Sequence, residues 1–211
     1  MIKKDYLINF QIYFLVTTTT TTSTTTTTAT TTTTTGTALS NGIGRWQKIF
    51  NHNTAGGLFS SQEDAKSKNP EDPNANLFSI LDQLEKYRNA EGNFHMKLCY
   101  PEVSGEDGGH CNEWVQTSNP TTDTTITGFQ AISLAFNLDS YNNPWVGLGR
   151  SPSGHPTFMD DAPSRGNWWS AIGATRYHGG SDTIPGANPH VVKKVELYVH
   201  TGNQSVDNHA N

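Results

Sequence analysis

Aromatic and hydrogen-bonding side chains gather in the second half of the chain, within a segment rich in glycine, proline and asparagine. Sugar rings present apolar C–H faces that stack on exposed aromatic rings, while Asn and Arg side chains hydrogen-bond the hydroxyls. We take six residues as candidate ligand-binding groups for a glycan: Trp145, Arg150, Asn167, Trp168, Trp169 and Tyr177. The alternative is that the tryptophans pack in the core, because each buries a large apolar area. Adjacent Trp168 and Trp169 on a strand would point to opposite faces, one inward and one outward.

Three aspartates, Asp160, Asp161 and Asp182, form a second candidate site. Carboxylate oxygens combined with loop carbonyls are the ligands that Ca²⁺ prefers. The spacing is not that of an EF-hand, so the alternative is that Asp161 caps a turn before Pro163. Calcium is accordingly the one cofactor that the sequence suggests.

A catalytic interpretation needs two groups placed for acid–base work. Glu113 with Asp160, or His95 with Asp107, would be the pairs for a glycosidase or an esterase. No nucleophile elbow, zinc-protease helix, phosphate-binding loop or dinucleotide glycine motif accompanies them. We therefore expect a protein that is not an enzyme.

The two cysteines, Cys99 and Cys111, enclose a short loop that contains Pro101 and several glycines. An even cysteine count favours a disulfide if the chain is exported. Two reduced, buried thiols are the alternative. A zinc site is not expected, because there is no second cysteine pair.

The N-terminal segment indicates export. Residues 1–16 join a basic pair to an apolar stretch, as in a secretory leader, and the stretch is too short to span a bilayer. An imperfect gene start or a buried strand is the alternative. Residues 17–40 hold a threonine tract broken by Ser23 and Ala29, which predicts a disordered, O-glycosylated stalk or a translated nucleotide repeat without a role.

The remaining chain divides into a globular part, residues 41–200, and a polar tail, residues 201–211, in which Asn203 begins an N-glycosylation sequon. The globular part is long enough for one domain with its own core. The formal net charge is −5, and no basic patch is visible, which argues against nucleic acid as a partner. The expected location is extracellular or at the cell surface.

Alternation of apolar residues predicts strands over Arg45–Phe50, Phe94–Tyr100, Gln130–Phe136 and Lys194–His200. One amphipathic helix is predicted over Asn76–Asn89, where Leu77, Ile80, Leu81, Leu84 and Tyr87 form one apolar stripe. We expect a single α+β or mainly β domain with antiparallel sheets, one packed helix and long loops.

Several segments together carry a resemblance to a known type of module. They are Leu77–Glu85, Lys97–Pro101, Cys111–Pro120, Trp145–Gly149, Trp168–Gly173, Ile184–Gly186 and Lys194–Val199. The chain resembles an uncharacterised extracellular module of marine invertebrates, particularly cnidarians, which is loosely similar to fibrinogen-like lectin domains. The wider similarity implies two disulfides and a calcium loop, whereas this chain has one cysteine pair and no Asp-x-Asp loop.

These observations favour a secreted or surface-tethered, non-catalytic recognition module. Glycans or extracellular glycoproteins are the expected partners. The alternative is a structural component of matrix or mucus that acts through protein–protein assembly.

Overall fold

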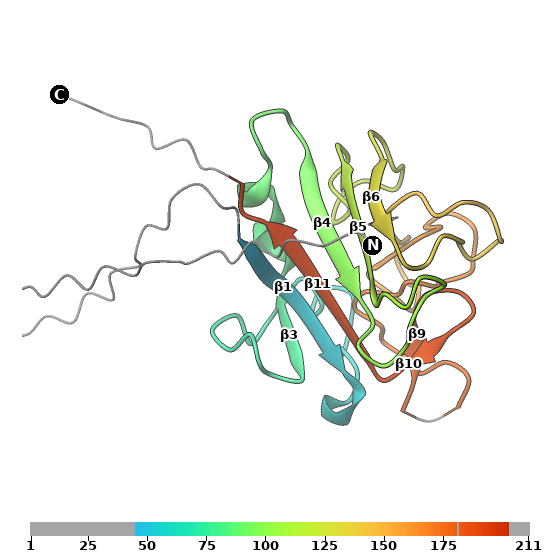
Figure 1. The fold of residues 1–211 in the computed structure, drawn as a ribbon. Helices are drawn as coiled ribbons and strands as arrows, with labels where there is room; N and C mark the ends of the chain where they lie inside the picture. The colour runs from blue at the N-terminus through green and yellow to red at the C-terminus, as the bar shows by residue number, and fades with distance from the viewer. Residues whose placement is uncertain (1–44, 181, 203–211) are drawn as a thin grey trace, which may run out of the picture. The chain divides into compact units, whose positions relative to one another are not determined.

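Seven antiparallel strands form the main sheet in the computed structural model, which describes residues 45–180 and 182–202 (Figure 1). Their order across the sheet is β2-β3-β1-β11-β4-β5-β6. Their bounds are β1 (Trp46–Asn53), β2 (Ser67–Lys68), β3 (Leu77–Ile80), β4 (Phe94–Cys99), β5 (Cys111–Gln116), β6 (Gln130–Leu134) and β11 (Lys194–His200). The described residues belong to one compact unit, and the expected mainly β class with antiparallel sheets is confirmed.

Strands β4 and β11 lie at the centre of this sheet and alternate as the sequence predicts. Phe94, Met96 and Leu98 of β4 are completely buried, as are Val195 and Leu197 of β11. The residues between them on β4 face the other side of the sheet and are partly exposed. The core therefore lies on one face of the sheet, which is covered by loops and by a short helix.

Strand β5 fastens the loops to that inner face through two buried amides. The Asn112 side chain donates to the Phe136 carbonyl at 2.7 Å and accepts from the Phe136 amide at 2.8 Å. Gln116 donates to the Leu148 carbonyl at 3.0 Å, and its Oε1 accepts from the indole of Trp114 at 2.8 Å. Because buried polar groups must find partners, these bonds fix the path of the covering loops.

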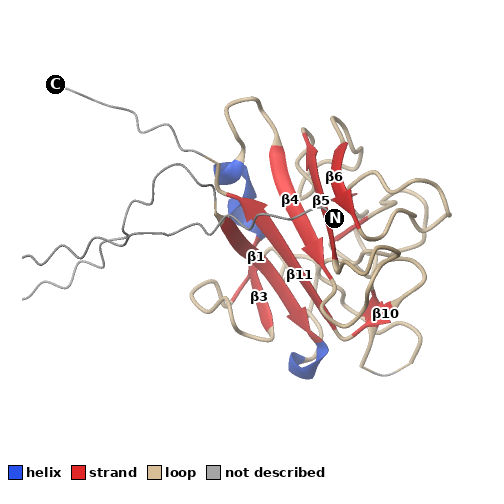
Figure 2. Cartoon of the chain, in the orientation of Figure 1, coloured by secondary structure: helices blue, strands red, loops and turns tan. Residues whose placement is uncertain are grey.

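Four short strands hold the loop-rich part together. β7 (Gly149–Arg150) pairs with β8 (Met159–Asp160), and β9 (Ile184–Pro185) pairs with β10 (Val191–Val192). Most of the remaining backbone there is loop (Figure 2). Gly173 lies in this part at φ 72°, and a Cβ there would come within 2.5 Å of the Ala65 Cβ, so the position needs glycine.

The helix predicted over Asn76–Asn89 is wrong in its first half. Leu77–Ile80 is strand β3, which pairs with β1, and the chain turns into a 3₁₀ helix, η2 (Leu81–Tyr87), only afterwards. A second 3₁₀ turn, η1 (Thr54–Gly56), follows β1. Phe78 and Ser79, which lie outside the predicted apolar stripe, are also buried. Because β3 is buried on both faces, its sequence lacks the alternation of apolar and polar residues that indicates a strand.

Strand β6 forms one edge of the sheet and is mostly exposed. The strand itself was predicted, but Ile132 is 53% exposed, so the expected half-buried alternation is absent. Phe136, which follows the strand, is buried.

The Cys99–Cys111 disulfide is present and joins residues that lie opposite each other on β4 and β5. Among the described residues there is no free cysteine. The bond closes the hairpin between these strands at the end where the loop Pro101–His110 begins.

The two ends of the described unit lie together. The Thr201 amide donates to the Arg45 carbonyl at 2.8 Å, beside the start of β1 and the end of β11. At the far end of these strands, the Thr54 amide donates to the Lys193 carbonyl. Strands of seven to eight residues place this end about 25 Å from the first. The expected leader (1–16), threonine tract (17–40) and Asn203 sequon lie outside the described residues. Within those residues, no helix is long and apolar enough to cross a membrane.

Candidate functional site

Two tryptophans and a histidine form one aromatic surface in the loop-rich part. The ring of His178 lies edge-on to Trp168 at 5.4 Å and to Trp169 at 5.2 Å between centroids. The guanidinium of Arg176 lies 5.3 Å from the centroid of the Trp168 ring. We call Asn167, Trp168, Trp169, Arg176, Tyr177 and His178 the aromatic surface. Its aromatic rings and hydrogen-bonding groups are those that a glycan would need.

Backbone pairing on both sides fixes the two tryptophans. Ser170, at φ 52°, donates its amide to Gly186 at 2.6 Å, and Ile172 pairs with Met159 on the other side. The turn that carries His178 is closed by a second pair of bonds, from the His178 amide to the Thr183 carbonyl at 2.9 Å and from the Thr183 hydroxyl to the His178 carbonyl at 2.6 Å. The fold therefore fixes the backbone that carries these three rings.

The tryptophans differ in exposure. Trp169 is half-buried, whereas Trp168 is 7% exposed and Trp145 only 2%. The Trp145 ring packs against Trp114 at 4.7 Å and Phe129 at 5.8 Å. Trp145 therefore lies in the core, as the alternative interpretation has it, because a wide indole fills the space beneath the loops; its contact with a ligand stays a prediction.

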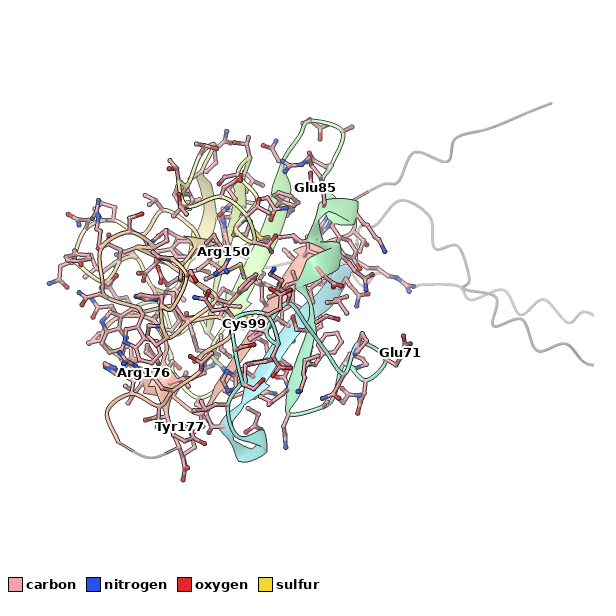
Figure 3. All side chains as sticks on the ribbon, turned by 180° about the vertical axis from the view of Figure 1, so that it is seen from behind. Glu71, Glu85, Cys99, Arg150, Arg176 and Tyr177 are labelled. Atoms are coloured by element: carbon pink, nitrogen blue, oxygen red, sulfur yellow. A yellow bond between two sulfur atoms is a disulfide. The ribbon has the colours of Figure 1, made fainter. Side chains whose placement is uncertain are left out.

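Tyr177 and Asn167 directly precede His178 and Trp168, respectively, in the chain. Asn167 is exposed and its amide donates to the Ser140 carbonyl at 3.3 Å, while Tyr177 is half-buried. Figure 3 shows Arg176 and Tyr177 beside each other on the loop-rich part, on the side away from the start of β1. The turn that carries them is tied to the far end of β1, because the Thr54 hydroxyl donates to the Asp182 carbonyl at 2.8 Å.

Arg150 lies in a different pocket, of about 430 Å³, whose side chains include Gln62, Glu63, Arg150, Ser153, His155 and Thr175. We call this the Arg150 pocket. Burial lowers the pKa of His155, and the positive charge of Arg176 lowers it further. Arg176 therefore lies close enough to act on both the Arg150 pocket and the aromatic surface.

Asp160 and Asp161 are both buried, but they have different partners. Asp160 accepts from the Ser151 hydroxyl at 2.7 Å and the Ala162 amide at 2.9 Å, whereas Asp161 accepts from the Ser140 hydroxyl at 2.6 Å. Burial raises the pKa of Asp160 to about 7 and that of Asp161 to about 6, against the effect of these hydroxyls.

The structure does not bring the three candidate calcium ligands together. Asp182 is exposed, next to β9, and no three acidic, histidine or cysteine side chains among residues 45–180 and 182–202 are placed to hold a metal ion. Asp160 ends β8 and accepts from Ser151, whereas Asp161 follows the strand and accepts from Ser140, so the two carboxylates enter different networks.

The two acid–base pairs considered from the sequence are not formed either. Glu113 contacts His95 instead, at 2.8 Å, on the outer face of the sheet, and Asp160 contacts Ser151. Asp107 accepts from the Gly109 amide within its own loop.

Sequence reasoning missed Arg176, His178 and His155. Arg176 and His178 flank the predicted Tyr177, directly before the glycine pair 179–180, and a polar–aromatic run before glycines is a recognisable loop signal. His155 carries no such signal, because only folding places it near Asp160.

Comparison of the chain with protein-family models, with curated proteins and with solved structures finds no match.

Proposed function

We propose that this protein is a non-catalytic recognition module that binds glycans at the aromatic surface. The observation that carries the proposal is the Trp169–His178–Trp168 group, in which the half-buried Trp169 indole contacts His178 and the exposed Arg176 lies over the neighbouring Trp168 ring. Stacking on such a ring, combined with hydrogen bonds from neighbouring polar groups, is how sugars are recognised.

An extracellular or cell-surface location fits the same proposal. The disulfide is of a kind that persists in oxidising compartments. The two ends of the described unit lie together, and the aromatic surface is tied to the far end of β1. A module attached through its N- or C-terminal segment would thus present the surface away from its attachment, toward free glycans or extracellular glycoproteins.

The test is a glycan-array screen of the full chain, first with calcium and then with chelator. We expect selective binding that chelator leaves unchanged, because the described residues contain no three-ligand metal site. Binding that chelator abolishes would require a calcium site and direct mutagenesis to Asp160, Asp161 and Asp182. The absence of selective binding in both conditions would contradict the proposal.

A role in matrix or mucus assembly is the second candidate, and β6 favours it. This edge strand is exposed, and Ile132 is 53% exposed on it. An exposed edge strand presents backbone groups that another chain can pair with. Analytical sedimentation of wild type and Ile132→Lys separates the two roles. If the protein assembles, wild type should form oligomers as its concentration rises, and Ile132→Lys should remain monomeric. Glycan recognition does not require oligomers.

A further inference from the structure

Arg150 is a fixed, half-buried cation with no carboxylate partner. Its Nη1 donates to the Ser151 and Phe158 carbonyls at 2.9 and 2.8 Å, and its Nη2 donates to Gln62 at 3.0 Å. The guanidinium lies 4.3 Å from the Phe158 ring centroid. Its Nε makes no hydrogen bond with a described residue, and among those residues Arg150 makes no ion pair.

Such an arginine is poised to receive an anion. Charged side chains are seldom buried unless they are paired, because removing the charge from water is costly. Burial lowers the pKa of Arg150, which reports that cost, although the negative charge of nearby Glu63 acts in the opposite direction. Because the guanidinium is already fixed, it loses little further conformational entropy when it binds an anion. One edge of a guanidinium also matches the spacing of two oxygens of a carboxylate or sulfate.

The charges around the Arg150 pocket favour an anion as well. Arg176 adds a second positive charge near His155. Glu63 is the carboxylate in the lining; its side chain is 79% exposed and it pairs with Lys66 at 2.6 Å. Asp160, beneath His155, is completely buried and bonded to Ser151. Arg150 and Arg176 thus bring two positive charges to this pocket, against the one exposed carboxylate of Glu63 in its lining.

The pocket is also linked to the aromatic surface. Arg176 follows Thr175, which lines the pocket, and its guanidinium lies over Trp168 at the same time. A ligand that stacks on the aromatic surface can therefore place a substituent toward Arg150. We propose that the Arg150 pocket binds an oxyanion, a carboxylate or a sulfate ester, of an acidic glycan. The inference that the ligand is a glycan rests on the proposed function. The inference that it carries an anion rests on the Arg150 pocket.

The first experiment tests the anion without a sugar. The full chain, ¹⁵N-labelled, is titrated with sodium sulfate against sodium chloride of equal ionic strength, and the Arg150 Nε–H signal is followed by NMR. We expect a saturable shift of this signal with sulfate. A shift that does not saturate, or that Arg88, the residue after η2, shows equally, would overturn the inference.

Substitutions at the rim provide the variants. Replacing Arg150 would also remove the bonds that hold Ser151 and Phe158, so Ser153→Glu is the better choice: Ser153 is exposed, lines the pocket and leaves those bonds intact. We expect Ser153→Glu to raise the sulfate concentration at half-saturation at least 10-fold. Ser164→Glu, the same change at an exposed serine outside this pocket, is the matched control and should leave the midpoint unchanged. Equal midpoints in the two variants would count against the pocket.

The second experiment compares lactose, 3′-sialyllactose and 3′-sulfolactose on the same variants. Preference for either acidic form, lost in Ser153→Glu, supports the inference and identifies carboxylate or sulfate. Equal binding of all three, without a sulfate response, overturns the anion pocket but leaves glycan recognition standing. Saturable sulfate binding with no glycan binding on any array supports the pocket and overturns the glycan function.

Discussion

The imidazole Nδ1 of His155 lies 3.5 Å from the Oδ2 of Asp160, whose side chain is completely buried. Burial acts in opposite directions on the two pKa values, because it disfavours the charged form of each group. It lowers the pKa of His155 and raises the pKa of Asp160 to about 7. The free energy of unfolding therefore depends on pH through this pair, which lies beneath the Arg150 pocket.

This pH dependence predicts the behaviour of Asp160→Asn. Because the pKa of Asp160 is raised on folding, its stabilising effect is complete below the unfolded value of 3.8 and is lost as the pH rises through about 7. The stability advantage of Asp160→Asn, which cannot ionise, over wild type should therefore be larger at pH 8 than at pH 5, by on the order of 2 kcal/mol. Urea unfolding at both pH values tests this, with exposed Asp82→Asn as the control. An advantage that is no larger at pH 8 than at pH 5 would contradict the account.

Gln116 is predicted to hold the loops onto the sheet. Gln116→Leu would leave the Trp114 indole, the Leu148 amide and the Leu148 carbonyl without their partner. An unsatisfied buried polar group costs about 1–3 kcal/mol, so we expect a loss of at least about 2 kcal/mol in the free energy of unfolding. Faster amide hydrogen exchange at Leu148 should accompany it. Unchanged exchange there would show that the loops do not depend on this amide.

The disulfide is predicted to stabilise the hairpin between β4 and β5. Its cysteines are 12 residues apart, and a loop of that size contributes roughly 3 kcal/mol by restricting the unfolded chain. Cys99→Ala with Cys111→Ala should lower the free energy of unfolding by that amount, and a reducing agent should do the same to wild type. If reduction leaves the urea midpoint of wild type where it was, the bond has no stabilising role.

Trp145 is predicted to be structural. Trp145→Ala removes a buried ring that packs against Trp114 and should cost about 3–5 kcal/mol. Trp145→Phe keeps part of the ring, so it should lose less stability and retain glycan binding. Loss of binding by Trp145→Phe at unchanged stability would restore Trp145 to the site.

Regular alternation was sufficient to predict β1, β4, β6 and β11, and the even cysteine count favoured the disulfide that is present. Strand β5 escaped notice because two of its three inward residues are the amides Asn112 and Gln116, which are polar yet buried. No pattern along the chain marks such residues as core, since their partners are backbone groups of distant loops. Their burial becomes evident only once those loops are in place.

The candidate site was predictable only where neighbours in sequence are neighbours in space. Trp168, Trp169 and Tyr177 share one turn-rich segment, and both tryptophan rings contact His178, the residue after Tyr177. Arg150 was assigned to the same site by sequence proximity, but pairing of β7 with β8 directs it into a separate pocket. Arg176 lies close to both the Arg150 pocket and the aromatic surface. Its position there follows from the way residues 168–178 fold, which the sequence pattern does not indicate.

The most direct test of glycan recognition is the Kd of the full chain for the tightest array ligand, measured by calorimetry for wild type, Trp169→Ala and Trp46→Ala. Trp46 is a half-buried tryptophan at the start of β1, outside the aromatic surface. We predict that Trp169→Ala weakens binding at least 10-fold, whereas Trp46→Ala binds as wild type does. Equal binding by wild type and Trp169→Ala would contradict the aromatic surface as the site of recognition.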